Sequence, residues 1–301
     1  PTVDGSSKET QSNMTSSELS SNMSSNISSD TLSDIISDIS SNGEVSSENI
    51  EETQTPVYLN YEEHDFSYLD NLDNECKGWG QGLQLDEYNR PISGDIYNEK
   101  FGEYGGVFIM PNNEGEKKMY LTFDEGYENG YTTPILDALL ERNIKAVFFV
   151  TGHYAKKNPE LIQRMIDEGH IIGNHGMGHK IVPNLTNEEA FKEISDLHNY
   201  MAETYNYNMT LFRPPEGKWS VRTLKLASDM GYKSILWSYA YKDYDEKAQI
   251  GADKALPKIT KAAHNGAIYL LHAVSKDNSE IMGNFIDNLQ KDGYEFCLLD
   301  F

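Results

Sequence analysis

The sequence predicts an α/β protein with a parallel sheet that follows a long polar tail. Two patterns carry this prediction. From Lys118 to the end of the chain, apolar runs of strand length alternate with helical patterns of apolar residues. Before that, no aromatic residue occurs until Tyr58. Alternating strands and helices are typical of parallel sheets, whereas a polar segment without aromatic residues cannot bury enough apolar surface to fold.

Seven apolar runs have the length and composition of strands. They are residues 119–123, 145–150, 170–174, 210–214, 234–240, 267–272 and 295–299. Six helical patterns lie between them, marked by apolar residues at helical spacing. These patterns fall within residues 135–140, 161–166, 191–201, 224–230, 259–263 and 281–289. The alternation alone leaves open whether the sheet closes into a barrel or stays open.

Composition divides the chain into three parts. Residues 1–56 are rich in Ser, Asn, Glu and Asp, with ten acidic residues against one lysine, and we expect a disordered linker. Residues 57–117 are rich in Tyr, Trp and Gly, which indicates a loop-rich extension packed on the main domain at residues 118–301. The chain begins at Pro1 without a signal peptide, so a processed or trimmed N-terminus is expected.

Charge and hydropathy exclude several classes of partner. The formal net charge of -23 would repel nucleic acid and anionic membrane surfaces, and neither is expected as a partner. No run of eighteen apolar residues occurs, so no transmembrane segment is expected.

The two cysteines, Cys76 and Cys297, are far apart in sequence, and whether they form a disulfide stays open. The protein is expected to be a monomer.

Polar residues with catalytic chemistry stand at five strand ends. Carboxyl ends of parallel strands in an α/β barrel meet at one face, where active sites are built, so these side chains are expected to lie close together. A purely structural origin for each residue, taken alone, remains an alternative. The residues are Asp124 and Glu125, His175 and His179, Arg213, Asp243, and His272.

Each pair has a chemical rationale. Two imidazoles beside a carboxylate, with room for water, make a catalytic metal site. Arg213 precedes two prolines on a rigid backbone, from which it would orient a carboxylate and lower its pKa. His272 ends a buried strand and is a candidate general acid that a carboxylate, Asp243, would tune. The alternatives are unrelated surface histidines, an ordinary ion pair and a capped histidine.

The order of these motifs resembles the polysaccharide deacetylase family, carbohydrate esterase family 4, also called the NodB-homology domain. The motifs are TFDEG, HGMGH, RPPEG, the Asp in WSYAYKDYD, and LLH, and the resemblance covers residues 118–301. Segments such as GWGQGL and YLTFDEGYENGYT are similar to the spore-type peptidoglycan N-acetylmuramic acid deacetylases. The resemblance implies a distorted (β/α) barrel, with the extension at 57–117 belonging to the same subgroup.

The resemblance also implies a metal site. Glu125, His175 and His179 match the ligands of a divalent ion, zinc or a similar metal. Two departures put metal affinity in question. Glu125 stands where the family has an Asp, and Gly176 stands where the family usually has a Ser or Thr whose hydroxyl braces the loop.

The remaining motif residues match the family's proton-handling groups. Asp124 corresponds to the general base and Arg213 to the residue that orients it. His272 corresponds to the general acid and Asp243 to the carboxylate that tunes it. Separately from the resemblance, aromatic residues near the strand ends, Trp219 and Tyr244 among them, are expected to stack on sugar rings of the substrate, with a place in the core as the alternative.

The implied activity is metal-assisted hydrolysis of N-acetyl groups on a cell-wall polysaccharide, that is, of carbon–nitrogen bonds other than peptide bonds. The expected substrate is N-acetylmuramic acid of peptidoglycan, in the δ-lactam pathway of spore cortex. Such a protein would act outside the cytoplasm at the cell envelope, held there by its tail. The alternatives are another acetylated glycan, chitin-like or xylan, and a metal-poor, non-catalytic protein that binds the cell wall.

Overall fold

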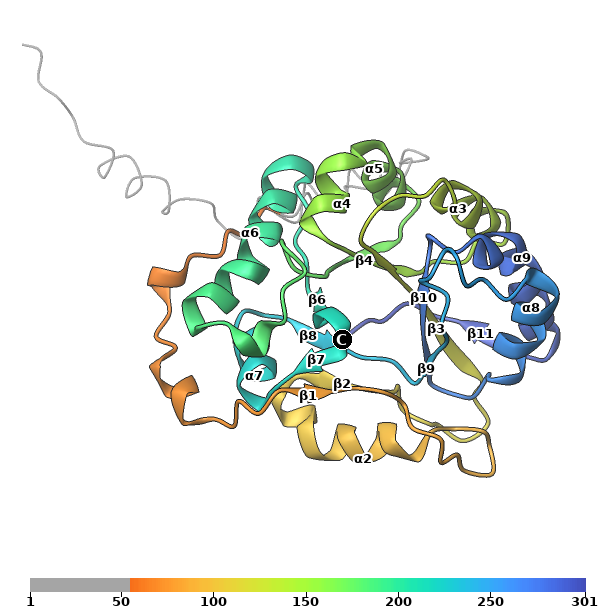
Figure 1. Ribbon diagram of the computed structural model, residues 1–301, viewed down its shortest axis with the longest axis horizontal. Coiled ribbons are helices and arrows are strands. Elements are labelled where there is room, and N and C mark those ends of the chain that lie inside the picture. The colour runs from red at the N-terminus through yellow and green to blue at the C-terminus, as the bar shows by residue number, and fades with distance from the viewer. Residues whose placement is uncertain (1–54) are drawn as a thin grey trace, which may run out of the picture. The chain divides into compact units, whose positions relative to one another are not determined.

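A nine-stranded parallel sheet lies at the centre of residues 55–301, the part of the chain that this computed structural model describes (Figure 1). Its strand order is β2-β8-β6-β5-β4-β3-β10-β9, and β11 pairs with β3. Apart from Ser, Thr and Gly, buried aliphatic and aromatic residues dominate the longer strands. The strands are β2 (Gly106–Val107), β3 (Lys118–Glu125), β4 (Val147–Val150), β5 (Ile171–Asn174), β6 (Leu211–Phe212), β8 (Lys233–Ile235), β9 (Tyr239–Ala240), β10 (Ala267–His272) and β11 (Glu295–Phe296).

The sheet curls into an incomplete barrel, which confirms the predicted distorted (β/α) fold. The run at 234–240, predicted as one strand, is divided into β8, which is second in the strand order after β2, and β9, which lies at the other end. Only residues 236–238 connect them, and a link of that length spans at most about 14 Å, so the two ends of the sheet must approach each other. Within this link, Leu236 N–H donates to Val107 and Ser238 N–H donates to Ile268. We call residues 236–238 the seam.

Helices cover the outside of the curled sheet (Figure 1). The longest, α6, begins after Thr186, whose side chain accepts from Glu189 N–H while the Glu189 carboxylate accepts in return. The α-helices are α2 (Ile92–Phe101), α3 (Thr132–Glu141), α4 (Gly152–Lys157), α5 (Pro159–Asp167), α6 (Asn187–Tyr205), α7 (Val221–Asp229), α8 (Ala252–Lys261) and α9 (Lys276–Lys291). Short 3-10 helices are η1 (Tyr61–Glu63), η2 (Ser67–Asn71), η3 (Gly102–Tyr104), η4 (Val182–Asn184) and η5 (Pro215–Gly217).

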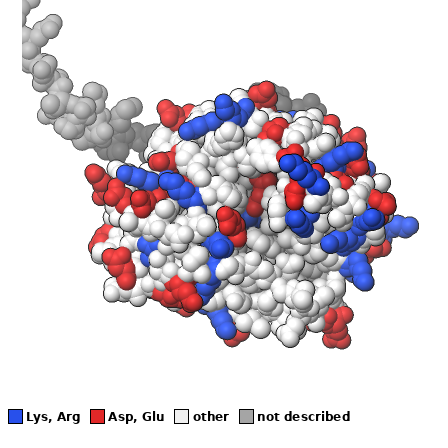
Figure 2. Space-filling view, in the orientation of Figure 1, with Lys and Arg blue, Asp and Glu red and all other residues white. Residues whose placement is uncertain are grey.

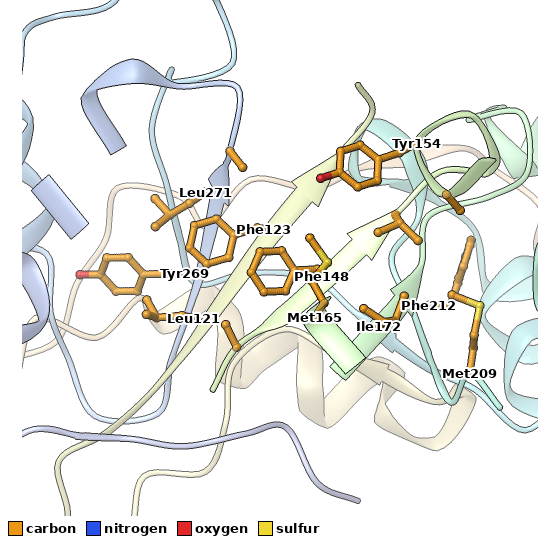
Figure 3. Packing of buried hydrophobic residues seen from close by; sticks show 14 of the residues in the cluster. Leu121, Phe123, Phe148, Tyr154, Met165, Ile172, Met209, Phe212, Tyr269 and Leu271 are labelled. Carbon is orange, nitrogen blue, oxygen red and sulfur yellow. The ribbon is translucent and has the colours of Figure 1, made fainter. Parts of the chain in front are cut away.

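The core has two layers, one on each face of the sheet. Figure 3 shows part of the outer layer, between sheet and helices, where Phe123 and Phe148 stack with ring centroids 5.0 Å apart. The inner layer fills the curled sheet and includes Tyr120 and Phe149. Successive side chains of a strand point to opposite faces, so odd-numbered residues of β3 face the helices and even-numbered ones face the barrel interior.

Residues 57–117 contribute strand β2 to the sheet, and other parts of this segment contact helices and loops around it. β1 (Lys77–Gly78) pairs antiparallel with β7 (Lys218–Trp219), forming a separate two-stranded ribbon. Next to this ribbon, Trp79 Nε1 donates to the carbonyl of Trp237 in the seam over 2.8 Å. The described residues belong to one compact unit. Of the predicted linker at 1–56, only the last two residues fall within the described part.

The described residues also show the state of the two cysteines and the hydropathy of the helices. Both cysteines are free, with Cys76 exposed and Cys297 half-buried, so no disulfide joins them. Within residues 55–301, none of the helices is long and apolar enough to cross a membrane.

Candidate active site

Asp124 and His272 face each other at the ends of neighbouring strands. They are register partners in the parallel pairing of β3 with β10. Both strands are buried apolar runs that end on these polar groups. Asp124 lies on the interior face of β3, in line with Tyr120. The pairing therefore brings a carboxylate and an imidazole to one edge of the barrel, as the strand-end argument predicted.

A buried arginine holds the Asp124 carboxylate. Arg213 Nη1 donates to Asp124 Oδ1 over 2.8 Å, and its guanidinium lies 4.1 Å from the centre of the Phe149 ring. Burial alone would raise the pKa of Asp124. The charge of Arg213, with smaller contributions from His175 and His272, outweighs burial and brings that pKa below its ordinary value. Asp124 is therefore an ionised carboxylate at neutral pH.

Arg213 also holds the seam. Its Nε donates to the carbonyl of Ile235 over 3.0 Å, and its Nη2 donates to the carbonyl of Leu236 over 3.3 Å. These bonds use the remaining faces of a guanidinium that has no exposure to solvent. One side chain thus links the base at the end of β3 to the point where the barrel closes.

Asp243 and His272 form a second pair. Asp243 Oδ1 lies 2.8 Å from His272 Nδ1, and Asp243 Oδ2 accepts from the His272 backbone N–H over 2.8 Å. Because Asp243 is buried and accepts only, Nδ1 carries the proton and Nε2 remains free for a substrate. Burial alone would lower the pKa of His272, but the charge and hydrogen bond of Asp243 outweigh it and raise that pKa above the ordinary value.

His175 and His179 lie together on the loop after β5. Their ring centroids are 4.8 Å apart, and His175 Nε2 lies 3.5 Å from Asp124 Oδ2. His175 Nδ1 is 2.8 Å from the carbonyl of Arg213, to which it donates. Burial is the main reason why the pKa of His175 falls to about 4, so the ring is neutral at pH 7. The structure therefore places His175 beside Asp124 and His179 beside His175.

A glutamate that the sequence analysis missed braces this loop. Glu193 of α6 is buried, and its Oε1 accepts from the backbone N–H groups of Gly178 (2.7 Å) and Lys180 (3.1 Å). Gly176 has φ +85°, and a Cβ there would lie 2.7 Å from the same oxygen. The Glu193 carboxylate therefore braces this loop. In the family that the sequence resembles, a hydroxyl at the position of Gly176 is expected to have that role. The sequence around Glu193 resembles that of any exposed helical glutamate, so it carried no signal.

Glu125 does not join the histidines, contrary to the prediction that it ligates a metal with them. It is the odd-numbered neighbour of Asp124 and shares the helix-facing side of β3 with Phe123. Its carboxylate is fully buried without a hydrogen-bond partner. Burial first, and then the charges of Glu128 and Asp124, raise the pKa of Glu125 well above its ordinary value.

The predicted zinc set therefore does not converge in this structure. Within residues 55–301, no group of three or more His, Cys, Asp or Glu side chains is placed so that it could hold a metal ion. His175 and His179 remain a pair of imidazoles, of which His175 lies beside Asp124. The cause is the period of the strand, which sends adjacent residues of β3 to opposite faces.

The structure separates the two residues expected to contact sugar, burying one and exposing the other. Trp219 is fully buried and packs edge-on against Phe101, with centroids 4.7 Å apart, so its ring cannot meet a substrate. Tyr244 is 56% exposed, and its ring lies edge-on to His272 at 5.7 Å. The exposed Tyr127, which was not anticipated, donates a hydrogen bond to Glu246.

Figure 2 shows a hollow in the middle of one face of the molecule, with acidic side chains visible inside it. Around the hollow, acidic and basic side chains are interspersed, and the face shown has no broad basic patch.

Comparisons with known proteins identify relatives of this architecture. The family described as polysaccharide deacetylase matches residues 111–235. The chain is 41% identical over 232 residues to the peptidoglycan-N-acetylmuramic acid deacetylase PdaA of Bacillus subtilis, covering 75% of this chain and 86% of that protein. It is 34% identical over 190 residues to a peptidoglycan-N-acetylglucosamine deacetylase of Bacillus cereus, covering 62% and 87%. The solved structure of Bacillus subtilis PdaA, a family 4 carbohydrate esterase, has a TM-score of 0.70 at 39% identity, covering 74% of this chain and 94% of that one.

Proposed function

Since the chain belongs to the polysaccharide deacetylase family, we propose that it hydrolyses the N-acetyl groups of peptidoglycan, at N-acetylmuramic acid. The observation that carries the proposal is the meeting of two pairs, Asp124 with Arg213 and His272 with Asp243, at one edge of the barrel. One pair holds an ionised carboxylate for the role of base, and the other holds an imidazole whose raised pKa suits the role of acid. Amide hydrolysis needs both at the same time.

The first half of the reaction uses the ionised pair. Asp124 accepts a proton from a water molecule, whose oxygen attacks the carbonyl carbon of the acetyl group. Arg213 keeps the carboxylate charged and fixes its orientation through one hydrogen bond, while Oδ2 is left to meet the water. A tetrahedral adduct forms, with the former carbonyl oxygen carrying the negative charge.

The second half uses the protonated pair. His272 donates its Nε2 proton to the sugar nitrogen, the carbon–nitrogen bond breaks, and acetate and a free amine leave. Asp243 stabilises the imidazolium and presents Nε2 by holding Nδ1–H. Water and the N-acetyl sugar are consumed and acetate and the amino sugar are formed, so atoms and charge balance once the two side chains exchange protons with solvent.

Members of this family are generally metal-dependent, and a bound divalent ion would polarise the acetyl carbonyl. His175 and His179 are the two members of the predicted zinc set that lie together. Glu125 faces away from them, so the steps above are assigned to side chains alone. The requirement for an ion is part of the experiments below.

The finer parts of the proposal follow from the substrate. Peptidoglycan lies outside the cytoplasm, and we place the reaction at the cell envelope. N-acetylmuramic acid rather than N-acetylglucosamine is favoured by the higher identity to the muramic acid enzyme. Deacetylated muramic acid is the precursor of the δ-lactam of spore cortex, which assigns the reaction to sporulation. The exposed Tyr244 ring beside His272 is assigned to a sugar ring of the glycan.

The test is mass spectrometry of purified peptidoglycan glycan strands after incubation with the protein, with added zinc and, separately, with a chelator. Replacement of one acetyl group by hydrogen lowers the mass of a sugar by about 42 mass units. This loss at the muramic acid residues of the glycan would support the proposal. Loss from glucosamine alone would correct the sugar. Retention of the folded protein on glycan without acetyl loss would favour the non-catalytic binding alternative. Inactivity on peptidoglycan together with activity on chitin or xylan fragments would overturn the substrate.

A further inference from the structure

A fully buried asparagine touches both members of the acid pair. Asn278 is in the first turn of α9, and its Nδ2 donates to Asp243 Oδ2 over 2.7 Å and to the carbonyl of His272 over 3.1 Å. Its Oδ1 accepts from the hydroxyl of Tyr241. Every polar group of the side chain therefore has a partner, and two of the three bonds reach the acid pair directly.

The Asp243 carboxylate is held at three points as a result. Oδ1 lies on His272 Nδ1, and Oδ2 accepts from the backbone N–H of His272 and from Asn278 Nδ2. A carboxylate on a freely rotating side chain could turn its oxygens away from the imidazole. With Oδ2 bound on two sides, Oδ1 has only one direction left, which is toward Nδ1.

The side chain of Asn278 is not needed to form the helix. The orphan N–H group at position 278 is capped by Ser275 Oγ over 3.1 Å, so helix α9 begins without any contribution from the Asn278 amide. A buried polar side chain costs desolvation unless it is paired, and an apolar residue would serve packing alone equally well. The arrangement of bonds instead matches a role at the acid pair.

We propose that Asn278 is a positioning residue, which locks Asp243 against His272 and so keeps Nε2 of His272 aimed at the leaving nitrogen. The proposal rests on the proposed function for its kinetic consequences, but its structural content concerns the acid pair alone. The position needs a donor for Asp243 Oδ2 and the His272 carbonyl together with an acceptor for Tyr241. A carboxylate there would place a like charge beside Asp243, and a leucine would supply neither donor nor acceptor.

The charged and titratable groups that act on His272 are known from the structure. Asp243 and Asp124 favour the imidazolium, Arg213 disfavours it, and the Tyr244 ring lies against it. Asn278 is uncharged, so its removal leaves this set intact and changes only the alignment of Asp243. A change in the pKa of His272 on substituting Asn278 therefore reports alignment rather than a lost charge.

The experiment compares Asn278→Leu with the wild-type protein by two readouts. In the first, NMR titration of His272 should show its pKa falling by about half a unit or more, because a loosened Asp243 stabilises the imidazolium less. In the second, kcat should fall about tenfold to a hundredfold with little change in KM, since general acid catalysis typically contributes 10²–10⁴-fold. The alkaline limb of the kcat profile should move to lower pH.

A double-mutant cycle tests whether Asn278 acts through Asp243. In an Asp243→Ala background, Asn278→Leu should have little further effect on kcat, because the carboxylate that it aligns is gone. The matched control is Asn98→Leu, which removes two hydrogen bonds from another inward-facing asparagine, to Ile109 and Phe108, outside the acid pair. That control should leave the pKa of His272 and kcat unchanged.

The outcomes separate this proposal from the proposed function. An unchanged His272 titration in folded Asn278→Leu protein, or an equal loss of kcat in both backgrounds, would overturn the positioning role. Should Asn278→Leu fail to fold, Tyr241→Phe removes only the donor to Asn278 Oδ1, and a smaller shift of the same sign is expected; no shift there would also overturn it. Should the wild type release no acetate, the proposed function fails while the NMR titration still decides the role of Asn278.

Discussion

Asp124 Oδ1 accepts a hydrogen bond of 2.8 Å from Arg213 Nη1, and both residues are buried. An ion pair shielded from water in this way keeps the carboxylate charged and directed. The partner that would otherwise neutralise Asp124, a proton, is held off until the pH is low.

Asp124→Asn should reduce acetate release by about a thousandfold or more while the protein stays folded. The amide has no basic lone pair for the water proton, but its Oδ1 still accepts from Arg213. Acetate release and a thermal unfolding curve measure the two effects. Asp95→Asn is the matched control, because Asp95 pairs with the buried Arg90 outside the site. Turnover near the wild-type rate in Asp124→Asn would reject Asp124 as the base.

The rate should form a plateau between the pKa values of Asp124 and His272. Arg213 counters burial and keeps the pKa of Asp124 below 3.8, and Asp243 counters burial and keeps the pKa of His272 above 6.5. A base works unprotonated and an acid works protonated, so kcat/KM should fall below about pH 3.8 and again above about pH 6.5, not between. A pH series of acetate release measures this, and Asp243→Asn should bring the alkaline limb down. A rate already falling with rising pH at pH 6 would contradict the assignment.

Glu193→Ala should loosen the histidine loop. It leaves the N–H groups of Gly178 and Lys180 without an acceptor, so the free energy of unfolding should fall by about 2–4 kcal/mol. Activity should fall about tenfold or more as His175 and His179 lose their fixed position. Denaturant unfolding and acetate release measure the two losses, and Glu193→Gln, which keeps Oε1, is the control.

The close approach of Glu193 to Gly176 predicts that a serine hydroxyl cannot be introduced at position 176 without a loss of stability. Gly176→Ser should lower stability rather than improve the site, because the backbone has φ +85° and the new Cβ would lie 2.7 Å from Glu193 Oε1. Equal or higher stability of Gly176→Ser would show that the loop does not depend on this close approach.

Glu125→Gln should keep activity within a few-fold and leave the content of bound divalent metal unchanged. Gln keeps the shape of the neutral acid, and the carboxylate does not face the histidines.

The pKa of Glu125 is raised, so the folded protein keeps a proton that the unfolded chain releases above about pH 4.5, and stability falls as pH rises. The variant lacks this penalty, so its gain in stability should be larger at pH 8 than at pH 5. Elemental analysis, acetate release and unfolding curves are the measurements, and joint loss of ion and activity would restore Glu125 as a ligand.

The sequence predicted the parts of the site that depend on strand ends. Asp124, Arg213 and His272 meet because each lies where a parallel strand stops, and a parallel sheet brings such ends to one edge. The barrel class followed from the alternation and the motifs. The division of 234–240 into β8 and β9 did not, because the side-chain hydrogen bonds that divide it, from Arg213 and Trp79, come from residues distant in sequence.

The differences between the expected and the observed placements of these residues have a common physical origin. Glu125 was assigned by its position in a motif, whereas the pleat of β3 decides which face it occupies. Trp219 was assigned by its proximity to strand ends, whereas the aromatic side chains of α2 and the inner core cover it. Glu193 and Asn278 went unnoticed because their partners are backbone groups and a single carboxylate, and such partners leave no periodic trace in a sequence.

Arg213 bonds both to Asp124 and to the seam, and this affects which substitutions the protein can accept during evolution. A substitution there removes the anchor of Asp124 and two hydrogen bonds at the seam together, so we expect it to lower the stability of the fold along with the activity and to increase clearance by proteolysis. A substitution at Asp124 or His272 leaves the seam intact. Related proteins that have lost the activity but still bind glycan should therefore carry substitutions at the positions of Asp124 or His272. They should retain the arginine that corresponds to Arg213.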